Sequence, residues 1–208
     1  SPANPLLLGT RLTLRPLPSL EVGLTKVTQT AGEGRPGGLR NLLRAFVGEG
    51  SNADTPSQAL IDPGNSLGGF DVRWRCPTGW GCAVYGQMIG EDEAGALPSK
   101  FLGLGSAEMW SSDGRQRYFA EYSNSFCRGL PGEKRIPGCA YGNVSYAQGY
   151  THTNRWLGAS QGSDSRLLTL GWLDSANGQS LRLHTGQVGR AIGNRVPGHE
   201  LKLMLAGF

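Results

Sequence analysis

Apolar and polar residues alternate along much of this chain with a period of two. The clearest stretch is FDVRWRC at 70–76, in which Phe70, Val72 and Trp74 alternate with Asp71, Arg73 and Arg75. A period of two predicts β-strands that have one apolar and one polar face. The same pattern predicts strands at 6–16, 20–25, 166–173, 180–186 and 200–205, and noisier alternation predicts others at 83–91, 101–111 and 116–126.

The connections between these strands are of two lengths. Tight turns are expected at 15–19, 77–81, 112–115 and 176–179, and long connections at 31–66, 92–100, 127–164 and 188–198. A soluble β-sandwich has no reason to alternate short and long loops, whereas a membrane barrel carries short turns at one rim and long loops at the other. We therefore predict an all-β fold, an antiparallel transmembrane outer-membrane β-barrel. A soluble secreted β-domain is the alternative.

Composition agrees with this fold class. Glycine makes up 33 of the 208 residues and charged residues only 17%, which is typical of a chain with many turns and strands. No run of about 18 apolar residues occurs, so the sequence contains no transmembrane helix. The formal net charge of +4 is mild and the arginines form no basic run, so no nucleic-acid partner is expected.

Several segments carry a family resemblance. They are GEGRPGG (32–38), GNSLGGFDVR (64–73), YGQMIGEDEAGALPSKFLGL (85–104), FAEYSNSFC (119–127), GCAYGNVSYAQGY (138–150) and DSRLLTLG (164–171). In this order, and over almost the whole chain, they resemble the Wzi family of capsule-assembly proteins. The resemblance implies a many-stranded outer-membrane barrel with a helical element at the periplasmic side. It also implies a lectin-like protein that binds and anchors capsular polysaccharide at the cell surface, without catalysis.

The same resemblance sets expectations for partners and domain organisation. Capsular polysaccharide and outer-membrane lipid are the expected partners, and the complete barrel is expected to be monomeric. About nine strands are visible in the sequence, whereas bacterial barrels close with an even number. Residues 1–208 are therefore expected to form one domain, the C-terminal half of a larger barrel.

Three consecutive acids at 91–93 directly follow an apolar strand. By alternation, Glu91 and Glu93 share the lumen side of that strand, about 6–7 Å apart. Arg73 and Arg75 on the neighbouring strand are their expected partners in a lumenal ion-pair network that supports the barrel. Contact of Glu91 and Glu93 with polysaccharide at the rim is the alternative. The expected network comprises Asp71, Arg73, Arg75, Glu91, Asp92 and Glu93.

Two carboxylates at this spacing also suggest an outer-membrane hydrolase of glycan or lipid, since glycosidases use acid pairs roughly 5–9.5 Å apart. Such an enzyme needs a cleft in which the two acids differ in pKa. The histidines at 152, 184 and 199 are isolated, and no nucleophile elbow accompanies them. We therefore expect no catalytic residue, no metal and no cofactor, and the hydrolase remains the second hypothesis.

The four cysteines bracket two loops. Cys76 and Cys82 flank PTGWG, and Cys127 and Cys139 flank RGLPGEKRIPG. These spacings predict two disulfides and an oxidising compartment, and they lack the two-residue spacing typical of zinc ligands. Free buried thiols are the alternative.

Two long connections carry functional candidates. In the first, apolar residues at helical spacing predict a short helix, either a plug in the lumen or a segment across the rim, with its apolar stripe used for packing rather than membrane binding. That stripe consists of Leu39, Leu42, Leu43, Phe46 and Val47. In the second, aromatic residues alternate with polar ones, which predicts contact with sugar rings; an aromatic girdle at the membrane interface is the alternative. The predicted glycan contacts there are Tyr141, Tyr146, Tyr150, Arg155 and Trp156.

Overall fold

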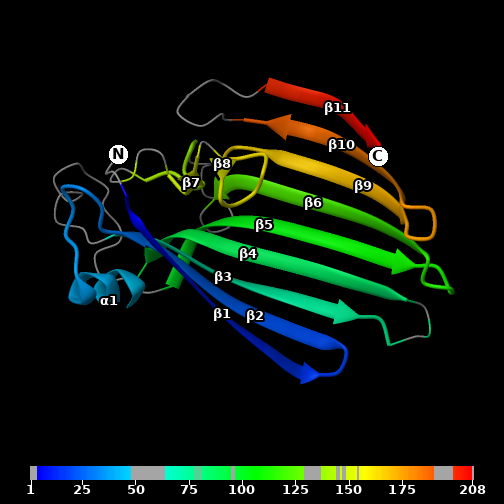
Figure 1. The fold of residues 1–208 in the computed structure, drawn as a ribbon, viewed down its shortest axis with the longest axis horizontal. Helices are drawn as coiled ribbons and strands as arrows, with labels where there is room; N and C mark the ends of the chain where they lie inside the picture. The colour runs from blue at the N-terminus through cyan, green and yellow to red at the C-terminus, as the bar shows by residue number, and fades with distance from the viewer. Residues whose placement is uncertain are drawn as a thin grey trace.

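A single twisted antiparallel sheet makes up most of the molecule (Figure 1). The computed structural model describes residues 4–47, 64–77, 79, 81–94, 97–128, 137–143, 146, 149–153, 155–189 and 199–207, with the backbone alone for 91–94, 97–99, 128 and 199–207. The strands of the sheet, in spatial order, are β1 (Leu6–Leu17), β2 (Leu20–Thr30), β3 (Gly64–Arg75), β4 (Cys82–Ala94), β5 (Leu97–Trp110), β6 (Gln116–Arg128), β9 (Arg166–Asp174), β10 (Gln179–Val188) and β11 (His199–Gly207). The remaining elements are helix α1 (Leu39–Val47) and a small hairpin of β7 (Thr151–His152) and β8 (Arg155–Trp156).

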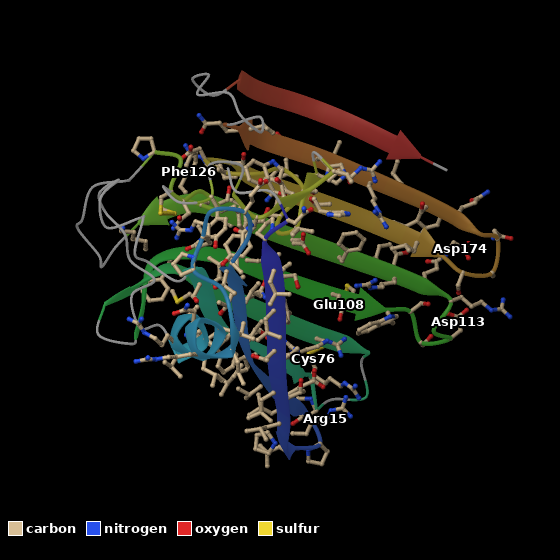
Figure 2. All side chains as sticks on the ribbon, turned by 60° about the vertical axis from the view of Figure 1, so that its left-hand side comes forward. Arg15, Cys76, Glu108, Asp113, Phe126 and Asp174 are labelled. Carbon is tan, nitrogen blue, oxygen red and sulfur yellow. A yellow bond between two sulfur atoms is a disulfide. The ribbon has the colours of Figure 1, made fainter. Side chains whose placement is uncertain are left out.

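The nine strands predicted from alternation are confirmed, and the connections fall at two rims. Tight connections join β1 to β2, β3 to β4, β5 to β6 and β9 to β10 at the rim on the right of Figure 1, here called the turn rim. The opposite rim, here called the loop rim, carries α1 and the β7–β8 hairpin. Figure 2 shows Asp113 and Asp174 at the turn rim and Phe126 at the loop rim, with Glu108 between them.

One predicted long connection is wrong. Strands β4 and β5 continue past the acidic run, with Asp92 opposite Ser99, Glu93 opposite Pro98 and Ala94 opposite Leu97. Backbone pairing does not require apolar side chains, so the two strands extend as a ribbon although the side chains become charged. Short and long connections therefore do not alternate strictly.

The two faces of the sheet differ in chemistry. Fourteen large apolar side chains on one face, here called the outer face, are 37–54% exposed. Register places all of them on the same side: Leu6, Leu12, Leu14, Leu24, Phe70, Trp74, Val84, Met88, Met109, Tyr118, Tyr122, Leu168, Leu170 and Leu181. An exposed apolar surface that crosses every one of these strands is typical of a barrel surrounded by lipid and is unusual for a soluble domain.

The inner face is covered at the loop rim by the segment that joins β6 to β9. Its core contains Leu67 and Leu102 from the sheet together with Ala140, Tyr141 and Tyr150 from the segment. Charged residues of this face lie farther toward the turn rim, where Phe119 and Leu173 are apolar neighbours of Glu108 and Arg117. The inner face thus combines a small packed core with a polar surface.

Helix α1 is confirmed at the predicted residues, but it lies on the outer face and not in the lumen. The hydroxyl of Ser66 donates a hydrogen bond to the carbonyl of Ala45 at 2.9 Å, and Ser66 lies on the same side of β3 as Phe70. Ala45 is fully buried, whereas Leu39, Leu43 and Val47 are 71%, 55% and 60% exposed. The expectation that the apolar stripe serves packing is therefore wrong for these three residues.

The sheet does not close on itself. Among the described strands, β1 is paired only with β2 and β11 only with β10. Both edges run along whole strands and lie on opposite sides of the sheet in Figure 1. The described strands thus form an open antiparallel sheet with two free edges.

Candidate functional site

The segment between β6 and β9 is fixed at its base by a disulfide. Cys127, at the end of β6, is bonded to Cys139 with a Cα–Cα distance of 5.8 Å. The second disulfide joins Cys76 to Cys82 at the turn rim, with a Cα–Cα distance of 5.3 Å. Both predicted disulfides are confirmed. The Cys127–Cys139 disulfide draws the segment back over the inner face soon after the chain leaves β6.

Three tyrosines of this segment are buried against the sheet. Tyr141, Tyr146 and Tyr150 are 5%, 0% and 2% exposed. The Tyr150 hydroxyl donates to the carbonyl of Asn65 at 2.8 Å, and the Tyr146 hydroxyl donates to that of Ala31 at 3.0 Å. These rings therefore attach the segment to β2 and β3. Their contact with glycan stays a prediction, and their burial shows a packing role that alternation of aromatic and polar residues did not reveal.

The β7–β8 hairpin projects from this packed segment at the loop rim. Thr151 pairs with Trp156 and His152 with Arg155, and the Leu157 amide donates to the Tyr150 carbonyl at 2.9 Å. The Trp156 ring lies 5.8 Å from the Tyr141 ring and is half-buried, while Arg155 and His152 are exposed. Of the predicted contacts in this loop, Trp156 and Arg155 are thus the ones that a large ligand can reach.

A hollow of about 610 Å³ lies between this segment and the inner face. Its strand walls are largely apolar and include Val27, Leu67, Ile89 and Leu102. Its polar groups include Gln161, whose amide donates to the Ser123 hydroxyl at 2.6 Å. The hollow has the size of an ordinary ligand pocket, roughly 300–1,000 Å³, but its lining suits apolar groups better than sugar hydroxyls.

Ion pairs occupy the inner face toward the turn rim. Arg11 binds Asp71 through two hydrogen bonds of 2.6 and 2.9 Å. Glu108 lies between two arginines: Arg73 donates to one oxygen at 2.5 Å, and Arg117 Nε donates to the other at 2.9 Å. The side chain of Glu108 is only 11% exposed, so paired guanidinium groups compensate for its loss of solvent.

The predicted partners within the inner network are wrong. Arg73 lies opposite Tyr85 and Arg75 opposite Ala83, near the turn rim. Glu91 is six residues farther along β4 than Tyr85, or about 20 Å at the usual strand rise. Arg73 and Arg75 therefore do not pair with the acidic run at 91–93. The side chains of Glu91, Asp92 and Glu93 lie outside the described residues, and their roles stay predictions.

The sequence analysis missed Arg11, Glu108 and Arg117 as members of the network. Arg11 follows the alternation of the first strand, so its face was predictable. Glu108 and Arg117 lie on strands joined by the Asp-Gly turn at 113–114, which sets Glu108 opposite Phe119. The turn position was therefore the available signal for bringing these two residues together.

Two classes of feature are absent from the described residues. None of the helices there is long and apolar enough to cross a membrane. No group of three or more His, Cys, Asp or Glu residues in the described part of the chain is arranged to hold a metal ion.

The chain matches a known protein family and a bacterial relative. Residues 1–206 match the family described as "Capsule assembly protein Wzi". A Klebsiella pneumoniae protein described as an uncharacterized 55.8 kDa protein in the cps region is 41% identical over 112 residues, which cover 51% of this chain and 21% of that protein.

A solved structure is similar as well. It is Wzi of Escherichia coli, described as an outer-membrane protein involved in group 1 capsule assembly and a carbohydrate-binding β-barrel; the identity is 29% and the TM-score 0.65, over 87% of this chain and 37% of that one. The chain thus spans well under half the length of either relative. The match along nearly all of the chain, together with the exposed apolar face of its sheet, shows that this chain belongs to the Wzi family of capsule-assembly proteins, β-barrel proteins of the outer membrane.

Proposed function

We propose that this protein holds capsular polysaccharide at the cell surface as a lectin-like barrel and does not cleave it. Support comes from its family and from the description of the related Escherichia coli protein as a carbohydrate-binding barrel. The long loops of such barrels face the cell exterior, so the loop rim is the side available to a surface polymer.

The observation that carries the proposal is the fixed presentation of the β7–β8 hairpin. Trp156 is backed by Tyr141, whose own ring is buried in the core, and Arg155 lies beside it on the exposed side. A sugar ring presents C–H surfaces that fit an aromatic face, and its hydroxyl or carboxylate groups accept hydrogen bonds from a guanidinium group. A hairpin held by a disulfide and a packed core loses little conformational entropy on binding.

A non-enzymatic role fits the carboxylates of the inner face. Both oxygens of Asp71 and both oxygens of Glu108 accept hydrogen bonds from arginine side chains. A general acid of a glycosidase instead needs an environment that favours its protonated form. His184, which contacts the Thr169 hydroxyl at 2.9 Å, lies on the inner face, away from the hairpin that carries His152. Glu91 and Glu93 remain secondary candidates for glycan contact at the same rim.

We further propose that strands outside residues 1–208 complete the barrel and that outer-membrane lipid surrounds its outer face. The open edges of β1 and β11 support the first point, because unpaired backbone groups cannot face lipid. The row of exposed apolar side chains supports the second. A complete barrel has no free edge that would favour association with another copy, so we expect a monomer.

The test is binding of purified capsular polysaccharide to the detergent-solubilised protein. Trp156→Ala is expected to weaken the affinity roughly fivefold to tenfold, since an aromatic contact contributes on the order of 1 kcal/mol. The matched control is Trp74→Ala, which removes an exposed tryptophan from the outer face near the turn rim. Unchanged affinity in Trp156→Ala, or an equal loss in both variants, would contradict the proposed site.

A further inference from the structure

Helix α1 presents an apolar ridge that the sheet does not cover. The ridge consists of Leu39, Leu43 and Val47, which are 71%, 55% and 60% exposed. These residues are spaced by four positions and so form one line along the helix, on the side away from the buried Ala45. The burial of Ala45 fixes this orientation, because its contact with β3 leaves the ridge pointing away from the sheet.

The contacts under the helix place it on the lipid-facing side of the wall. The Ala45 carbonyl accepts a hydrogen bond from Ser66, and the Ser66 and Thr28 hydroxyls are 3.0 Å apart. Thr28 and Ser66 pair with each other and share a face with Leu24 and Phe70, which belong to the apolar outer surface. The ridge therefore continues the outer surface beyond the point where β2 and β3 become polar.

Helix α1 covers β2 and β3 beyond Leu24, toward the loop rim. Thr28 is four residues beyond Leu24, or about 13 Å along the strand and about 10 Å along the membrane normal at the usual barrel tilt. The positions of β2 and β3 there are polar and buried under α1, whereas Leu6 of β1, opposite Thr30, is apolar and exposed beside them. Over β2 and β3, the apolar surface at this height is thus supplied by the helix.

The charge of the helix identifies the chemistry of its surroundings. Residues 39–47 contain Arg40 and Arg44 and no acidic residue, and Lys26 lies 6.0 Å from the centre of the Phe46 ring. An amphipathic helix with basic residues beside an apolar ridge is the usual form of a segment that lies in a membrane interface with anionic headgroups.

We propose that α1 is an interfacial helix that inserts Leu39, Leu43 and Val47 into the outer leaflet and binds its phosphate-bearing headgroups through Arg40. The proposal uses the outer-membrane location of the protein and is independent of polysaccharide binding. The helix would fix the height of the loop rim relative to the membrane surface.

The test uses single cysteines, because all four native cysteines are in disulfides. Leu43→Cys and, separately, Val47→Cys are labelled with a fluorophore in the protein purified from outer membranes and reconstituted into phosphatidylcholine vesicles with or without phosphatidylglycerol. Leu24→Cys serves as the lipid-facing reference, and Leu157→Cys, half exposed in the loop over the inner face, as the aqueous reference. Heat-modifiable gel migration confirms that each variant is folded.

The expected result is quenching of the Leu43 and Val47 probes by brominated acyl chains and protection from iodide, as for Leu24. In vesicles that contain phosphatidylglycerol, Arg40→Gln should lower the ratio of membrane-inserted to water-exposed probe by roughly fivefold, since one basic residue near an anionic surface contributes about this factor. In vesicles of phosphatidylcholine alone, Arg40→Gln should leave this ratio unchanged. Iodide quenching of both probes at the level of Leu157 would overturn the proposal. Protection that appears only when capsular polysaccharide is added would also overturn it, in favour of a glycan contact.

Discussion

Arg11 and Asp71 form a bidentate ion pair directly over Gly23, with N–O distances of 2.6 and 2.9 Å. Gly23 lies opposite Thr13 on β1 and opposite Asp71 on β3. A Cβ atom at Gly23 would lie 2.4 Å from both the Arg11 guanidinium and the Asp71 carboxylate. The absence of a side chain at this position therefore allows an arginine and an aspartate two strands apart to meet.

The first prediction concerns this glycine. Gly23→Ala should separate the pair and leave the buried Asp71 carboxylate poorly compensated, which lowers the free energy of unfolding by about 2 kcal/mol. Urea unfolding of the protein in detergent micelles measures this change. The matched control is Gly9→Ala in β1, where a Cβ would meet nothing within 4 Å. Equal stability of the two variants would show that the pair does not support the sheet.

The second prediction distinguishes the two faces of β2. Leu24→Arg places a charge on the outer face and should cost about 2–4 kcal/mol near the middle of the membrane, which is seen as loss of assembled protein. Thr25→Glu places a charge on the inner face at the next residue, directly opposite Arg11, and should assemble well. Folded protein is quantified by heat-modifiable migration of outer-membrane fractions. Similar yields for both variants would contradict the assignment of the outer face to lipid.

The third prediction separates the two disulfides. Replacing Cys127 and Cys139 by serine frees the base of the segment over the inner face and removes about 3 kcal/mol of chain-entropy stabilisation. Glycan binding should weaken and the segment should become sensitive to protease. Replacing Cys76 and Cys82, which lie at the opposite rim, should leave binding unchanged. Equal glycan binding by the two double variants would show that the Cys127–Cys139 disulfide does not support the binding site.

The fourth prediction concerns the open edge at β1. If another strand pairs with β1 in the outer membrane, the amides of Leu6–Leu17 should resist hydrogen exchange as strongly as those of β4. The measurement is hydrogen–deuterium exchange with mass spectrometry on the protein extracted in detergent. Exchange of the β1 amides at the rate of the segment 31–38 would contradict a barrel that closes through this edge.

The sequence predicted the strands well because most of them keep a regular alternation that reflects their two environments, and the noisier ones are bounded by clear turn signals. It did not predict that β4 and β5 run on past the acids, since backbone pairing between Asp92 and Ser99 depends on the partner strand and not on local polarity. It also assigned Glu91 as partner to Arg73, because alternation fixes the face of a residue but not its height along the neighbouring strand.

The candidate site was predicted only in part for a related reason. Aromatic residues among polar ones indicated a functional loop, and Trp156 and Arg155 are accessible there. The same pattern gave no means of separating Trp156 from Tyr146, which is fully buried. That difference depends on the disulfide and the core contacts that fold the segment over the inner face. These contacts join residues that are distant in sequence, so a local pattern does not show them.

The most direct test of the central claim measures capsule retention and fold in the same cells. The Arg155→Ala, Trp156→Ala double variant should release polysaccharide into the medium while the heat-modifiable barrel remains in the outer membrane. The released chains should keep their normal length, because the protein holds the polymer and does not cut it. Retention of a normal capsule by this folded variant, or a change in chain length on loss of the protein, would contradict the account.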